Sequence, residues 1–432
     1  MIMIKRILTL SVSTVFTISL LASAQDYSVT KLPTLGGKLT RGFAINASGQ
    51  VVGSSDTSTY SHPFLWTRTR GIQDLGTLGN GTGSAASAIN DGGQVVGYSD
   101  PCGCQFVAFW WSPATGIQNI GSPNDLASLA SGINNSTEVV GTYLLFVYPN
   151  TFTKGFLWTQ LGGRQDLGTL GCVGCSPNAI NDSGKVVGSV SLPDGSNHAF
   201  TWTQADGLKD LGTLGGPNSG ARAINSAGQV VGISDTASGV QHAFLWTEAT
   251  GMQDVGTLPG ESYSSAASID AAGRIVGSSW NPVKTTGKPF SWTQAKGMKE
   301  LGPYGKRNIS GADGVNTAGQ ILVSAYVGGG YSSYLVTPLM YTTLTSSPNP
   351  SRVGEPVTFT AHVGSAVQGP PPDGEIVTFR TSGTVLAAVP LQAGVATFTT
   401  STLKGTRTIR AIYAGDLNYS SSKSAYLTQV VE

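Results

Sequence analysis

The chain consists of short apolar segments separated by glycine and polar turn residues. Residues 215–258 show the pattern clearly, with the segments SGARAIN, GQVVGIS, HAFLWT and GMQDVGTL. Each segment has the length of a strand of ~5–6 residues. No segment has apolar residues at the 3.6-residue spacing of a helix. The pattern therefore predicts units of four strands and an all-β protein.

These segments recur in a fixed order about every 45 residues, a period typical of solenoids, propellers and other arrays. The aromatic segment places a large apolar residue at one repeat position: Trp66, Trp111, Trp158, Trp202, Trp246, Trp292 and Val336. The AINxxGQVVG segment repeats an amide or acid: Asn46, Asn90, Asn134, Asn181, Asn225, Asp270 and Asn316. Seven units therefore share one plan, and we expect the tryptophans to lie in the core.

The pair Val230 and Val231 indicates how the units pack. Adjacent residues of a strand point to opposite faces of a sheet, so two adjacent valines require both faces to be buried. Each sheet is therefore expected to lie between two neighbouring sheets.

The ends of the array favour a closed ring over an open solenoid. The seventh unit has no DLGTL segment before a new pattern begins near Thr342, while residues 27–37 (YSVTKLPTLGG) form a fourth segment without a unit of its own. Pairing the surplus segment with the incomplete unit removes exposed sheet edges. The sequence predicts a seven-bladed β-propeller closed by the N-terminal strand, spanning residues 25–340.

The AINxxGQVVGxS, HAFLWT and GMQDLGTL motifs resemble the HAF repeat family of secreted bacterial proteins, over roughly residues 26–339. The family has no settled activity. The resemblance therefore implies a location and a repeat type, and it assigns no site residue.

Residues 341–432 alternate apolar and polar positions between Pro, Gly and Asp turns, which predicts one β-sandwich. The stretch AIYAGDLNYSSSKS, beginning at Ala411, resembles the end of bacterial Ig-like domains. That resemblance implies that Tyr413 packs in the core.

Residues 1–24 combine Lys5 and Arg6, an apolar run and a small-residue ASA site, as in a secretory signal peptide. A membrane anchor is the alternative, but the run is shorter and more polar than a ~20-residue span. The mature chain is therefore expected to be secreted, extracellular or periplasmic. With Lys+Arg 25 against Asp+Glu 24, the chain offers no excess positive charge to attract nucleic acid or an acidic membrane.

The four cysteines form two close pairs, Cys102 with Cys104 and Cys172 with Cys175. Disulfides are the first expectation in an exported protein, with the pairing left open. A zinc site is the alternative, although CxC departs from the usual CxxC ligand spacing.

Several polar residues recur with the repeat, which indicates a structural role. His62, His198 and His242 share a position held elsewhere by Val107, Lys154 or Lys288, an exchange that a general base does not tolerate. We expect these rings to hydrogen-bond a neighbouring strand or turn. Turn hydrogen bonding is likewise expected of two further series, Asp74, Asp166, Asp210 and Asp254, and Asn46, Asn90, Asn181 and Asn225.

Asp56, Asp100 and Asp235 follow the second strand of their units and are weak ligand-binding candidates. In a propeller their loops would share one face with both cysteine pairs. Solvated turn residues are the alternative, and the DxDxDG spacing of a calcium loop is absent, so no metal is expected.

Two functions remain open. The first is a secreted noncatalytic binding protein, with an extracellular polysaccharide as ligand and no cofactor. The second is a polysaccharide hydrolase or lyase, which needs two carboxylates ~5–9.5 Å apart. Asp125, Asp194 and Glu261 are acids outside the repeat pattern that could serve. The sequence has no GxSxG, HExxH or phosphate-loop motif.

Overall fold

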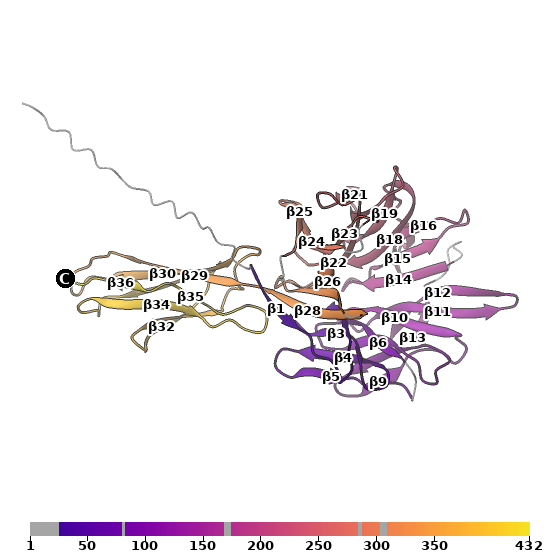
Figure 1. Cartoon of the computed structure of the whole chain (residues 1–432), viewed down its shortest axis with the longest axis horizontal. Helices are drawn as coiled ribbons and strands as arrows, with labels where there is room; N and C mark the ends of the chain where they lie inside the picture. Colours follow the sequence, from indigo (N-terminus) through magenta and orange to yellow (C-terminus); the bar gives the residue numbers. More distant parts are fainter. Residues whose placement is uncertain (1–25, 80–82, 168–173, 284–286, 303–308, 328) are drawn as a thin grey trace, which may run out of the picture.

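The computed structural model describes residues 26–79, 83–167, 174–283, 287–302, 309–327 and 329–432. The predicted signal peptide and Cys172 lie outside the described residues. Across the described part of the chain every regular element is a strand, so the all-β prediction is confirmed. Figure 1 shows β1–β28 on one side of the molecule and β29–β36 on the other.

The strands β1–β28 form seven antiparallel units of four strands, numbered here in chain order. Unit 1 consists of β2 (Thr40–Ile45), β3 (Val51–Asp56), β4 (Ser61–Thr67) and β5 (Gly71–Asp74). Unit 2 consists of β6 (Ser84–Ile89), β7 (Val95–Ser99), β8 (Val107–Ser112) and β9 (Gly116–Asn119). Unit 3 consists of β10 (Ala127–Ile133), β11 (Val139–Val147), β12 (Asn150–Thr159) and β13 (Gly163–Asp166).

The next three units follow the same order. Unit 4 consists of β14 (Gly174–Ile180), β15 (Val186–Ser191), β16 (Asn197–Thr203) and β17 (Gly207–Asp210). Unit 5 consists of β18 (Gly215–Ile224), β19 (Val230–Thr236), β20 (Gln241–Thr247) and β21 (Gly251–Gly256). Unit 6 consists of β22 (Tyr263–Ile269), β23 (Ile275–Trp280), β24 (Lys288–Thr293) and β25 (Gly297–Glu300).

Unit 7 combines both ends of the repeat array. Its strands are β26 (Ile309–Val315), β27 (Ile321–Val327), β28 (Gly330–Pro338) and β1 (Tyr27–Lys31). As predicted, the surplus N-terminal strand pairs with the last unit, antiparallel to β28 and with Val29 opposite Val336. Leu32, which follows β1, is only 1% exposed and packs on Phe64 and Leu335.

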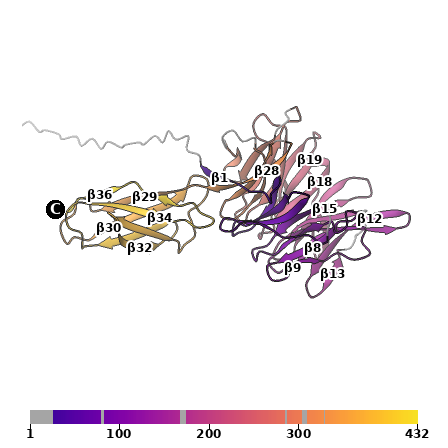
Figure 2. The same cartoon turned by 60° about the horizontal axis from the view of Figure 1, so that its bottom comes forward.

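Consecutive units contact each other through their first strands, and the first strand of unit 7 contacts that of unit 1. Because strands alternate in direction within a unit, two sets of connections separate. The turns after the first and third strands lie at one end, called the turn end. The loops after the second and fourth strands lie at the other, called the loop end. Figure 2 gives a second view of this arrangement.

The core lies between adjacent sheets. Val230 and Val231 are both fully buried, as two covered faces require. Six phenylalanines at one repeat position are at most 1% exposed: Phe64, Phe109, Phe156, Phe200, Phe244 and Phe290. The prediction of core tryptophans is right for Trp66, Trp111, Trp202 and Trp246, while Trp158 and Trp292 are partly buried. Val336, in the weaker seventh copy, is fully buried.

Each first strand contains a register shift at the same repeat position. One residue is left out of the pairing in each unit, and this set is called the shift residues: Phe43, Ser87, Ser131, Asn178, Arg222, Ala267 and Asp313. A residue inserted in this way bends its strand and re-aims its side chain.

A glycine in the opposite strand makes room for the shift. A Cβ added to Gly232 would lie 2.0 Å from the Gly220 carbonyl oxygen, and the equivalent glycines of units 1–4 and 6 meet a first-strand carbonyl at 2.0–2.1 Å. Unit 7 has Val323 at this position, and its first strand carries a second register shift between Ile309 and Gly311. The glycine of the VVG motif is therefore required by a close backbone approach.

The C-terminal strands form two facing sheets. One sheet contains β29 (Met340–Ser347), β30 (Val357–Ser365) and β33 (Val395–Thr400). The other contains β31 (Ile376–Thr381), β32 (Thr384–Pro390), β34 (Arg407–Tyr413), β35 (Ser422–Lys423) and β36 (Leu427–Gln429). Tyr413 is fully buried between them, as the resemblance to Ig-like domains implied. In the described part of the chain, no helix is long and apolar enough to cross a membrane.

Candidate binding sites

The three candidate acids after the second strands each have a hydrogen-bond partner within their own unit. Asp56 Oδ1 accepts a hydrogen bond from Ser61 Oγ at 2.7 Å, and Asp235 Oδ2 accepts one from Asn218 Nδ2 at 2.8 Å. Asp100 Oδ1 accepts from the backbone of the following turn, at 2.7 Å from Gly103 and 3.1 Å from Cys104. Asp100 and Asp235 are buried, which differs from the solvated turn residues of the alternative interpretation. The three carboxylates shape three separate loops.

The structure pairs Cys102 with Cys104 in a disulfide within the loop that Asp100 holds. Cys175 is also disulfide-bonded. Among the described residues, no group of three or more His, Cys, Asp or Glu side chains is arranged to hold a metal ion.

The acids outside the repeat pattern lie in different units and have different partners. Asp125 is buried and forms an ion pair with Arg164 at 2.5 Å, while Asp194 accepts a hydrogen bond from Ser196 on an exposed turn. Glu261, in the loop entering unit 6, is buried and lies 3.7 Å from Lys288 Nζ. The geometry therefore joins each acid to a cation or hydroxyl within or next to its own unit.

The recurring histidines and the recurring acids are partners of each other. His62 Nδ1 lies 2.8 Å from Asp74 Oδ2, and the same pair occurs as His198–Asp210 and His242–Asp254. Units 3 and 6 replace it with Lys154–Asp166 and Lys288–Glu300, both at 3.0 Å. The predicted bond to a neighbouring strand is therefore present.

Sequence reasoning treated these two series separately, although the sequence contained a signal that they pair. A basic residue occurs wherever an acid occurs, and unit 2 replaces both with the uncharged Val107 and Asn119. The acids also form the predicted turn bonds, since Asp74 Oδ1 accepts from Gly76 N at 2.8 Å.

The asparagines that precede the turns link the units at the turn end. Each side-chain amide donates to the backbone carbonyl of the same residue position in the next unit, at 3.0–3.1 Å. The chain of bonds runs from Asn46 to Asp270, and Asn316 of unit 7 donates back to Asn46. The expected turn bond is also present, since Gln50 N donates to Asn46 Oδ1 at 2.9 Å. The bonds that these asparagines form between consecutive units were not predicted from the sequence.

Six of the seven shift residues line a cavity of about 190 Å³ enclosed by the first strands, called the central cavity. It contains two ionisable side chains, Arg222 and Asp313, and one aromatic ring, Phe43. Burial raises the pKa of the Asp313 carboxyl, while the Ser324 hydroxyl at 2.6 Å and the charge of Arg41 act in the opposite direction. Burial lowers the pKa of Arg222.

Asp313 should make the stability of the fold depend on pH. A carboxyl group whose pKa is raised by folding contributes stability when protonated, and that contribution is lost as pH rises from the unfolded toward the folded pKa. We therefore expect Asp313→Asn to raise the melting temperature at pH 7 and to give no gain at pH 3. Thermal unfolding followed by circular dichroism measures both values. Asp206→Asn, on an exposed turn, is the control, and an equal gain at both pH values for Asp313→Asn would contradict the prediction.

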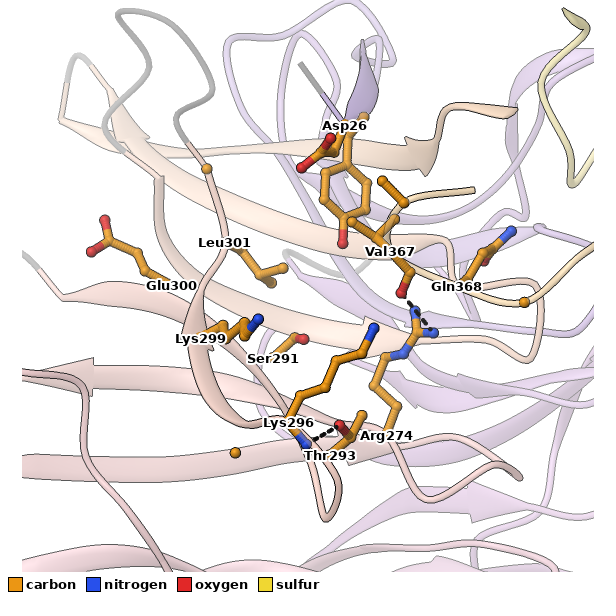
Figure 3. Close-up of a pocket in the computed structure, with 15 residues that line it drawn as sticks. Asp26, Arg274, Ser291, Thr293, Lys296, Lys299, Glu300, Leu301, Val367 and Gln368 are labelled. Atoms are coloured by element: carbon orange, nitrogen blue, oxygen red, sulfur yellow. Dashed lines mark hydrogen bonds between the residues drawn. The ribbon is translucent and has the colours of Figure 1, made fainter. Parts of the chain in front are cut away.

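A larger cavity of about 560 Å³, called the domain cleft, lies where unit 6 and β1 meet the loop after β30 (Figure 3). Its lining includes three cationic side chains, Arg274, Lys296 and Lys299, and two acidic ones, Asp26 and Glu300. Lys296 and Lys299 are exposed, and no hydrogen bond or ion pair involves their ammonium groups within the described residues. Arg274 is held in place by Asp270 at 3.9 Å and by the Val367 carbonyl at 3.5 Å.

A second cavity at the turn end is also lined by cationic side chains. It has a volume of about 510 Å³, is lined by Arg68 and Arg70 from the turn after β4, and includes Leu417 from the loop between β34 and β35. Arg68 is partly engaged, since its Nη2 donates to Thr337 Oγ1 at 3.0 Å. The cationic cavities therefore lie at the turn end, whereas the sequence directed attention to the loop end.

Comparison with known proteins identifies one module. Residues 344–432 match the model of the bacterial Ig-like domain (group 3), so the C-terminal sheets are an Ig-like domain. The match covers only that part of the chain. No curated protein matches the sequence. The resemblance of the repeats to the HAF repeat family stays a prediction.

Likeness to solved structures is low. TolB from Acinetobacter baumannii matches with a TM-score of 0.38 and 14% identity, over 67% of this chain and 81% of TolB. An extracellular domain from B. thetaiotaomicron matches with a TM-score of 0.40 and 10% identity, over 95% and 58%. Puromycin hydrolase matches with a TM-score of 0.47 and 12% identity, over 79% and 64%. The chain thus spans less than two thirds of the last two proteins, and likenesses at this level assign no function.

Proposed function

We propose that the chain is an exported, noncatalytic binding protein for an anionic polysaccharide. Its seven units would be the blades of a closed propeller over residues 25–340, followed by the Ig-like domain over residues 341–432. The pairing of β1 with β28 and the bond from Asn316 back to Asn46 support closure. The signal-like residues 1–24 and the Cys102–Cys104 disulfide support export.

The observation that carries the binding function is the excess of cationic over acidic side chains in the lining of the domain cleft, three against two, with the acid Glu300 already paired to Lys288. Lys296 and Lys299 present two ammonium groups that have no bonded partner among the described residues, and Arg274 adds a guanidinium group held by Asp270 and Val367. The second cavity, with Arg68 and Arg70, extends positive charge along the turn end. A polymer that carries one carboxylate per sugar could contact both cavities, and several weak contacts along one chain add up to strong retention.

The noncatalytic assignment rests on the partners of the acids. Asp125 is neutralised by Arg164, Asp194 lies on an exposed turn, and Glu261 lies beside Lys288. Glycoside cleavage instead needs two carboxylates that face the same bond.

The test is retention of residues 25–432 on immobilised polygalacturonate, with released reducing ends measured in the same samples. We expect retention on polygalacturonate, little retention on neutral dextran, weaker retention at high salt and no release. The double variant Lys296→Gln, Lys299→Gln should bind about thirtyfold more weakly, because each of the two lost charge-assisted contacts costs on the order of 1 kcal/mol.

A variant with the same change in net charge serves as the control. Lys404→Gln with Lys423→Gln alters exposed lysines of the Ig-like domain outside both cavities. It should retain the parent affinity. Equal loss in both double variants would mean that net charge alone drives binding, and release of reducing ends would favour the hydrolase alternative.

A further inference from the structure

The shift residues are the most varied repeat position of the first strands. The residues on either side follow the motif, with small residues before and an aliphatic residue two positions after, whereas the shift residues include an aromatic, an amide, a cation and an acid. Their side chains leave the strand pairing at the shift, and six of them line the central cavity. The repeat therefore directs one variable side chain from almost every unit toward one small space.

Aliphatic residues line the turn-end side of the central cavity. Ile45, Ile133 and Ile180 line it and also a second cavity at the turn-end asparagines. These residues follow the shift residues by two positions, and their equivalents Ile89, Ile269 and Val315 line the turn-end cavity. The two cavities therefore adjoin, with aliphatic side chains where they meet.

Arg222 is a cation without a protein partner in this space. Its side chain is solvent-accessible, yet the surrounding protein disfavours its charge, and in the described part of the chain no acid or carbonyl bonds its guanidinium group. The Asp313 carboxyl is bonded instead to the Ser324 hydroxyl, and no ion pair joins it to Arg222 among the described residues. Ala267 is the shift residue of the unit between them, and its small side chain leaves space between the two charged groups.

The other lining groups offer mainly acceptors and one apolar face. Ser131 Oγ already donates to the Pro177 carbonyl at 2.6 Å, and Asn178 Nδ2 donates to the Ala221 carbonyl at 2.7 Å. Ser131 Oγ can then only accept a further hydrogen bond, whereas Asn178 keeps one N–H donor and its Oδ1 acceptor, and the Asp313 carboxyl oxygens can accept. Phe43 adds a ring of the kind on which the C–H face of a sugar packs.

We infer that the central cavity binds a small hydroxylated carboxylate such as a sugar acid, with its carboxylate on Arg222. The guanidinium fork of Arg222 matches the two oxygens of a carboxylate, and the ligand hydroxyls would donate to Asp313 and Asn178. A volume of about 190 Å³ admits one such molecule and excludes a polymer. This site is separate from the two cavities of the turn end, which are the proposed binding sites of the polysaccharide.

Isothermal titration calorimetry on residues 25–432 tests the inference with D-galacturonate, D-glucuronate and D-gluconate, and with neutral D-galactose for comparison. We expect at least one of the acids to bind, and D-galactose to bind at least tenfold more weakly. Arg222→Gln should lower the affinity for that acid at least tenfold, and Arg222→Lys should lower it less, because it keeps the charge and loses the fork. Because Arg222 has no bonded partner among the described residues and the fold disfavours its charge, neither variant should lower the melting temperature.

Two results would overturn the inference. One is that none of the three acids binds, or that D-galactose binds as well as the acid. The other is that Arg222→Gln leaves the affinity unchanged. Lys296→Gln with Lys299→Gln separates the two sites, since it should weaken polygalacturonate retention and leave binding of the small acid intact.

Discussion

Replacing Gly232 with alanine should destabilise unit 5 by roughly 3 kcal/mol or more, because the new methyl group has no space to occupy. Its Cβ would lie 2.0 Å from the Gly220 carbonyl oxygen and 3.0 Å from the Ala221 Cα, and both are backbone atoms that cannot rotate away. This clash can be relieved only if β18 and β19 separate at the register shift. We expect a lower melting temperature and loss of hydrogen-exchange protection centred on residues 219–245.

Gly220→Ala is the matched control, because it lies in the partner strand of the same sheet. A Cβ at Gly220 meets its nearest neighbour, Ser189 Cβ, at an ordinary 3.7 Å. Its effect should stay within about 0.5 kcal/mol. Equal stability of the two variants would show that the close approach at Gly232 is not the reason for the glycine of the VVG motif.

Deleting residues 26–35 should open unit 7 and promote self-association. The deletion removes the whole ladder of β1 on β28, and losing the burial of Leu32 alone costs about 1.5–3 kcal/mol. It also exposes β28 as a sheet edge, which invites pairing with another chain. We expect faster hydrogen exchange in residues 309–338, and oligomers in size-exclusion chromatography with light scattering.

A synthetic peptide of residues 26–37 provides the control, since it supplies the missing strand in trans. It should restore protection of β28 and reverse the association, while the same peptide with Leu32→Asp should fail because it buries a charge. A deletion variant that stays monomeric and keeps its protection would contradict the role assigned to β1.

The sequence predicted the strands and the pairing of β1 with β28, the two ends of the repeat array, because both depend on local, repeated patterns. Adjacent valines specify two buried faces, and the surplus segment at residues 27–37 has one place where its edge can be satisfied. The ion pairs between the third and fourth strands could also have been predicted, because Val107 and Asn119 replace both partners in the same unit.

The binding surfaces were harder to predict because they depend on contacts between distant segments. The domain cleft forms where the loop carrying Val367 meets Arg274, and nothing near either residue in the sequence indicates the other. The central cavity depends on a one-residue register shift, and a motif written AIN passes over the variable residue that precedes it. Asp56, Asp100 and Asp235 were selected by their position after a strand, but their carboxylates accept hydrogen bonds from groups of their own units.

The register shift separates the residues that maintain the fold from those that can diversify. The VVG glycine, the core phenylalanine and the turn asparagine secure most units, whereas the side chain at the shift varies: Ser131 and Asn178 bond a neighbouring backbone carbonyl, and Phe43, Arg222 and Ala267 differ in size and charge. A descendant of this gene that altered only the codons of Phe43, Arg222 and Ala267 would keep its architecture and acquire a new chemical preference. Substitutions at these positions can therefore change the ligand that the protein binds while the fold stays stable.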